Sequence, residues 1–171
     1  EVEGMPKDLG SARELAMGKP DGGYRFRCWA CSLVGARPVG ETKEGAYGGI
    51  DGVMRFGDGD KKDKKIVVTV KGGDLGDPMV GELRGAVERE GAAIGLLVTL
   101  SEPTSRMLAE AAEAGFYESP GGGRHARIQI LWVGALLDGI GPDLPRDCAW
   151  GEVTPKGNRP AMRGPRSPRL F

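Results

Sequence analysis

A nearly continuous apolar stretch in the middle of the chain, Ile94 to Leu100, constrains the fold more than any other segment. Helical patterns precede it over residues 77–91 and follow it over residues 103–115. We expect Asp77 to cap the first helix and Pro103 to open the second. Strands covered on both faces are apolar at successive positions, whereas strands with one wet face alternate. The pattern therefore predicts a central strand between two helices.

The segments on either side complete the expected order of elements. Apolar residues at helical spacing predict a first core helix over residues 23–34, closed by Gly35. Residues 50–56 and 66–70 read as a β-hairpin, and residues 128–132 as a later strand that leads into a short helix. A hairpin followed by helical crossovers predicts an α/β domain with a mixed sheet and helices on both of its faces.

Length and composition predict one compact domain with a flexible end. A chain of 171 residues, 39% of them hydrophobic, can bury a core. Residues 1–22 are expected to be a linker with a short helix capped by Ser11 and Glu14, and residues 23–145 the domain. Residues 146–171 are rich in proline and arginine and poor in apolar side chains, which predicts a disordered basic tail.

The composition also indicates the cellular compartment and limits the kinds of partner that we expect. The chain has neither an apolar run of about 18 residues nor a basic or apolar start, so we expect a cytoplasmic protein that does not enter a membrane. Its three cysteines cannot all pair, which fits a reducing compartment. The net charge is zero, and residues 151–171 hold five basic side chains against one acidic. DNA contact by the domain itself would therefore be local or shared with a partner.

The sharpest candidate site pairs Asp51, in the segment Gly48 to Val53, with Lys71, about twenty residues later. In an antiparallel hairpin the start of one strand lies near the end of the next, so we expect the two side chains to converge. A carboxylate can hold Mg²⁺, and a fixed lysine can stabilise negative charge that develops on a phosphate. Taken alone, a glycine-rich turn and an edge-strand lysine are more often structural.

Three other features offer weaker candidates. Cys28 and Cys31 would form half of a zinc site or a redox pair, but no second cysteine pair exists, and their helical spacing favours core thiols. His125 is expected in a glycine-rich surface loop. The turn over residues 72–76 resembles a phosphate-binding loop but lacks the Gly-Lys-Ser/Thr ending.

Several segments between about residue 24 and residue 140 together resemble a known family. They are Gly45 to Gly52, Val68 to Gly73, Leu83 to Thr99, Ala111 to Tyr117 and Ile128 to Leu131. In this order they resemble the Mrr-like branch of restriction endonucleases, within the PD-(D/E)XK nucleases. Residues 25–30 and 33–38 resemble, more narrowly, the nuclease-like segment at the C-terminus of site-specific DNA adenine methyltransferases.

The resemblance implies an αβββαβ core and Mg²⁺-dependent cleavage of double-stranded DNA, with Mn²⁺ as a substitute ion. It places the catalytic residues at Asp51, Lys71 and Thr69, with Asp51 and the Val70 carbonyl as metal ligands. It also implies a prokaryotic restriction-modification system, with a DNA methyltransferase in cis or in trans and the possibility of a homodimer. Two arginines on the helix after the Lys71 strand are candidates for phosphate contacts: Arg84 and Arg89.

The sequence departs from the family pattern at three positions. Thr69 stands where relatives often have Glu or Gln, Arg27 where a first-helix Glu often contributes, and Tyr47 where methyltransferase-linked relatives usually have Asp. These departures favour the alternative of a catalytically inactive nuclease-fold module that binds DNA or serves as a scaffold. The possible replacement carboxylates are Glu41, Glu44 and Asp74.

Overall fold

The computed structural model describes residues 5–19, 21–39, 49–57, 63–119 and 123–145. The expected basic tail and residues 41, 44 and 47 lie outside the described residues. None of the described helices is long and apolar enough to cross a membrane.

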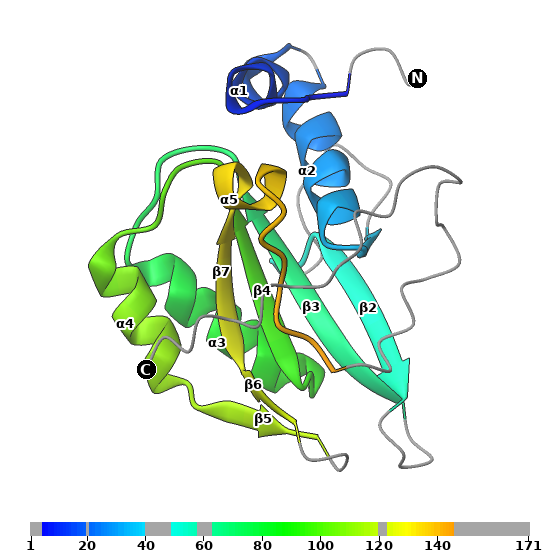
Figure 1. The fold of residues 1–171 in the computed structure, drawn as a ribbon, viewed down its shortest axis with the longest axis vertical. Helices are drawn as coiled ribbons and strands as arrows, with labels where there is room; N and C mark the ends of the chain where they lie inside the picture. Colours follow the sequence, from blue (N-terminus) through cyan, green and yellow to red (C-terminus); the bar gives the residue numbers. More distant parts are fainter. Residues whose placement is uncertain (1–4, 20, 40–48, 58–62, 120–122, 146–171) are drawn as a thin grey trace.

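A mixed five-stranded sheet, in the order β1-β2-β3-β4-β7, forms the centre of the domain (Figure 1). The strands are β1 (Arg37–Pro38), β2 (Gly52–Gly57), β3 (Asp63–Lys71), β4 (Ile94–Thr99) and β7 (Ile128–Trp132). The first three pair antiparallel, and β3, β4 and β7 pair parallel. The predicted α/β architecture is confirmed, and it is compatible with a restriction-endonuclease-like fold.

Helices cover both faces of the sheet. On one face lie α1 (Leu9–Met17), α2 (Gly22–Leu33) and the short α5 (Val133–Leu137), and on the other lie α3 (Pro78–Glu90) and α4 (Ser105–Glu113). The two faces have separate apolar cores, because successive side chains of a strand point to opposite sides. Every residue of β4 is buried, so the predicted central strand is confirmed.

The starts of the helices differ in detail from the sequence expectation. The N-cap of α1 is Asp8, whose carboxylate accepts the Ser11 amide at 2.7 Å, so the expected cap at Ser11 was wrong by three residues. Helix α4 begins at Ser105, two residues after Pro103, and Thr104 caps it by accepting the Met107 amide. Asp77 stands at the N-cap position of α3, but its side chain pairs with an α4 residue, Arg106, at 3.2 Å. Asp77 thus occupies the N-cap position without a capping hydrogen bond, and its carboxylate links α3 to α4 instead.

A small hairpin, β5 (Phe116–Glu118) with β6 (Arg124–Ala126), was missed because glycines separate two very short strands. His125 is therefore a strand residue and not part of a surface loop. Its side chain is only 11% exposed, and its Nδ1 atom lies 3.0 Å from a carboxylate oxygen of Asp143. The Arg124 guanidinium stacks over the Phe116 ring at 4.4 Å, which orders the outer end of the hairpin.

The last described residues form a C-terminal strap, residues 141–145, on the α2 face of the sheet (Figure 1). The side-chain amide of Gln129 donates to the Asp143 carbonyl at 2.7 Å and accepts the Asp143 amide at 2.8 Å. Leu144 packs against the core of that face, and Pro145 is buried. The Gln129 side chain thus binds both backbone polar groups of Asp143 and fixes the strap to β7.

Candidate functional site

The start of β2 packs directly against α2, and this contact fixes the position of Asp51. A Cβ atom at Gly52 would lie 2.8 Å from the Cys31 sulfur and 3.2 Å from the Ala36 Cβ, so only glycine fits. The Asp51 amide donates to the Val68 carbonyl at 2.8 Å. The glycine after the aspartate therefore lets α2 approach the end of the sheet where the candidate site lies.

The Asp51 side chain is part of the backbone hydrogen-bonding scheme of the sheet. The residue is 7% exposed, and its Oδ2 atom accepts the Val70 amide at 2.7 Å. Hydrogen bonds from backbone amides to a buried carboxylate are short and strong. Asp51 thus links the start of β2 to the end of β3, because one of its two side-chain oxygens accepts a hydrogen bond from the β3 backbone.

The other oxygen of Asp51 faces α2. Arg27, on that helix, places its Nε atom 3.7 Å from Oδ1, with the arginine side chain 26% and the aspartate side chain 6% exposed. Burial raises the pKa of Asp51, while the Val70 amide, Arg27 and Lys71 lower that pKa, in this order, without fully offsetting the burial. The neighbouring protein groups therefore offset part of the cost of burying this carboxylate, but not all of it.

The other two expected catalytic residues have partners of their own. Thr69 donates its hydroxyl to the Gly49 carbonyl at 2.8 Å, which holds the turn before Asp51. Lys71 is the last residue of β3, and its positive charge lowers the pKa of the Asp51 carboxyl. Its ammonium, however, forms its ion pair with Glu82 of α3, at 3.8 Å. The structure brings the three residues to one end of the sheet and gives each a different direct contact.

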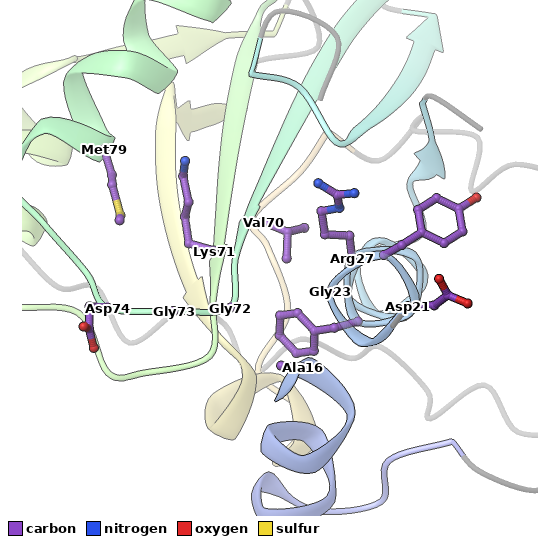
Figure 2. Close-up of a pocket in the computed structure, with 12 residues that line it drawn as sticks. Ala16, Asp21, Gly23, Arg27, Val70, Lys71, Gly72, Gly73, Asp74 and Met79 are labelled. Atoms are coloured by element: carbon purple, nitrogen blue, oxygen red, sulfur yellow. The ribbon is translucent and has the colours of Figure 1, made fainter. Parts of the chain in front are cut away.

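A cavity of about 620 Å³ opens between α2 and the end of β3, and Lys71 lines it, whereas Asp51 and Thr69 do not. Figure 2 shows Lys71 and Arg27 on either side of Val70, with Asp21 and Asp74 elsewhere on the lining. Asp74 is exposed and belongs to this cavity, whereas the other two replacement carboxylates lie outside the described residues. The α3 arginines proposed for DNA contact are partly exposed (Arg84) and exposed (Arg89).

The described side chains do not fit a magnesium site. Mg²⁺ requires oxygen ligands in near-octahedral geometry, usually with one or two carboxylates. Within the described ranges, no group of three or more His, Cys, Asp or Glu side chains is placed to hold a metal ion. Asp51 has Arg27 beside it instead of a second carboxylate. The expected Mg²⁺ or Mn²⁺ cofactor stays a prediction from the sequence.

The environment of Cys31 disfavours a zinc site or a redox pair formed with Cys28. This thiol is buried and lies 3.6 Å from the Asp51 carbonyl, to which it donates. Burial, and then the negative charge of Asp51, raises the pKa of Cys31 to about 12. A thiol that stays protonated at neutral pH is neither a good nucleophile nor a ready zinc ligand. The expectation of core or near-core thiols agrees with this burial.

The mixed sheet and the helices on both of its faces are compatible with a restriction-endonuclease-like domain. The chain belongs to the family described as NACHT-associated inactive restriction endonuclease 1, whose model matches residues 34–121, just over half of the sequence. The match contains Asp51, Thr69 and Lys71, and Arg27 lies outside it. Neither the curated proteins nor the solved structures contain a match to this chain.

The family assignment supports the coarse part of the sequence resemblance. It supports a restriction-endonuclease-like domain, but not its finer placement in the Mrr-like, methyltransferase-linked type. The word "inactive" in the family description agrees better with the non-catalytic alternative than with a Mg²⁺-dependent nuclease. Sequence reading had noted Arg27 only as a departure from the pattern. Its contact with Asp51 was missed, although a cation where relatives have a carboxylate is the signal that would have indicated it.

Proposed function

We propose that this domain is a catalytically inactive nuclease-fold module that acts by binding and scaffolding. The observation that carries the proposal is the environment of Asp51, whose two oxygens face the Val70 amide at 2.7 Å and Arg27 at 3.7 Å. Metal-assisted hydrolysis requires a carboxylate that binds the ion and an ion that activates water. A carboxylate whose contacts are already made within the protein is poorly suited to that task.

Two further features support a non-catalytic role. The hydroxyl of Thr69 is used to hold the Gly49 carbonyl, so it offers little to a metal ion. The fold itself is intact, with a buried central strand and a cavity still open at the end of β3. A binding module needs the fold but not the metal ligands. A fold without those ligands therefore favours a binding role over catalysis.

Duplex DNA is the partner we propose to test first. Lys71 on the cavity and Arg84 and Arg89 on α3 can contact phosphate, although the chain as a whole has zero net charge. We therefore expect weak and strongly salt-dependent binding. The DNA methyltransferase partner and the homodimer rest on the sequence resemblance alone, and the family description names an association with NACHT instead.

The test measures binding and cleavage on the same labelled duplex. Fluorescence anisotropy at about 50 mM and about 200 mM salt should show affinity that falls steeply with salt. Gel analysis with Mg²⁺ or Mn²⁺ should show no cut strand. Replacing Arg84 and Arg89 by Gln should reduce the salt slope by about 1 for each lost phosphate contact. Arg55→Gln, at an exposed position of β2, serves as the matched control.

The possible results separate the candidate functions. Cleavage that Asp51→Asn abolishes would show that the domain is a Mg²⁺-dependent endonuclease after all. Failure of the folded protein to bind duplex DNA at low salt would eliminate DNA as the partner and leave a scaffold for protein partners.

A further inference from the structure

The cation at the expected metal position is one of the protein's own side chains. The Asp51 carboxylate is nearly inaccessible, at 6% exposure, and its oxygens face the Val70 amide and the Arg27 guanidinium. A guanidinium is always charged and carries only hydrogen-bond donors. It can neutralise a carboxylate, but it cannot ligate a metal ion, and it repels one.

Lack of space does not explain why the described residues fail to fit a divalent ion. The cavity of about 620 Å³ reaches Arg27, Val70 and Lys71, and a hydrated ion is far smaller than that volume (Figure 2). Asp51 itself does not line this cavity, but Arg27 and Val70, whose groups face its two oxygens, do. The side chain beside Asp51 is a guanidinium and not a second carboxylate, and this distinguishes the site from a metal centre.

We infer that Arg27 is a resident counter-cation of Asp51, which excludes divalent ions and makes the carboxylate a structural link between α2, β2 and β3. The inference rests on the proposed absence of catalysis but concerns only the ion and the stability of the fold. It requires that the charge of Arg27 be needed even without DNA. It also requires that a carboxylate in place of Arg27 create the divalent-ion site that the natural chain lacks.

Arg27→Glu tests this directly. The variant places a second carboxylate beside Asp51, so it should melt at a lower temperature than the natural protein in the absence of metal. About 1 to 10 mM Mn²⁺ should then raise its melting temperature by roughly 3 to 10 °C, because an ion that binds only the folded state stabilises it. The natural protein should show no such rise. Arg25→Glu, at an exposed position of the same helix, is the matched control and should not respond.

The double variant Arg27→Glu/Asp51→Asn locates the ion. It should lose the Mn²⁺ response, because one of the two carboxylates is gone. If Arg27→Glu folds and melts the same with and without Mn²⁺, the inference is wrong. It is equally wrong if the natural protein binds one Mn²⁺, measured by electron paramagnetic resonance, and loses that ion on Asp51→Asn.

A conservative pair covers the case in which Arg27→Glu does not fold under any condition. Arg27→Lys keeps the charge and should stay close to the natural melting temperature, whereas Arg27→Met keeps the aliphatic stem and should melt several degrees lower. Equal stability of these two variants would contradict a counter-cation role. All these measurements are made without DNA, so a failure to bind DNA would overturn the proposed partner and leave this inference standing.

Discussion

The central strand β4 and the junction around Asp51 are both buried, but they depend on different interactions. In β4, six successive positions are buried, and they are mostly apolar residues that pack against helices on both faces. At the junction, one carboxylate meets an amide at 2.7 Å and a guanidinium at 3.7 Å. Apolar packing is non-directional, whereas polar contacts of this kind depend on particular atoms. The fold and the chemistry of the domain can therefore change independently.

The largest loss of stability is expected for a substitution in β4. Leu97→Ala removes a side chain with no solvent exposure between β4 and the α3–α4 layer, so it should cost about 2 to 5 kcal/mol of unfolding free energy. Urea denaturation followed by circular dichroism measures the loss. Leu108→Ala is the control, because that leucine is 48% exposed on α4, and its change should stay within about 0.5 kcal/mol. Equal losses for the two leucines would refute the packing argument.

A smaller loss of stability is expected for substitutions at the junction around Asp51. Asp51→Ala leaves the Val70 amide without its acceptor and Arg27 without its counter-ion, which should cost about 1 to 3 kcal/mol in the same assay. Asp51→Asn keeps an acceptor oxygen and should cost less. Asp74→Ala, at an exposed position on the cavity, should be nearly neutral. If Asp51→Ala were as mild as Asp74→Ala, the carboxylate would have no structural role.

The cap of α4 is a second polar contact with which the Asp51 junction can be compared. Thr104 accepts the Met107 amide at 3.2 Å, so Thr104→Ala should cost about 1 kcal/mol. Thr104→Ser keeps the hydroxyl and should restore most of the loss. A stability unaffected by Thr104→Ala would show that the neighbouring Pro103 alone fixes the start of the helix.

The pH dependence of stability is the most subtle difference between the two regions. Because burial raises the pKa of Asp51 in the folded state, its contribution is fully present below the unfolded pKa near 3.8. It is lost as the pH rises through the higher folded pKa. The natural protein should thus lose stability relative to Asp51→Asn across this window. The lowered pKa values of Asp8 and Glu90 act in the opposite sense, but they cancel between the two proteins. Parallel curves would contradict the burial effect.

The sequence predicted the regions that depend on periodicity and not those that depend on single contacts. Strand β7 begins and ends where the pattern placed it, and β4 ends one residue early. The β5–β6 hairpin was missed because three-residue strands carry almost no periodic signal. At the site, Asp51 and Lys71 do end up at neighbouring strand ends, but their direct partners are Arg27 and Glu82. Arg27 lies on a helix 24 residues before Asp51, and Glu82 on the helix that follows Lys71. Such single contacts between elements leave no periodic pattern in the sequence.

The strap at residues 141–145 has a practical consequence for anyone who divides this chain into fragments. Because Gln129 holds Asp143 by both its amide and its carbonyl, and Leu144 fills part of the α2-side core, the folded unit extends past α5 to Pro145. A fragment cut after Leu137 would expose the apolar surface beneath the strap and would be prone to aggregate. Fusions and expression boundaries should therefore leave residues 141–145 attached to the domain.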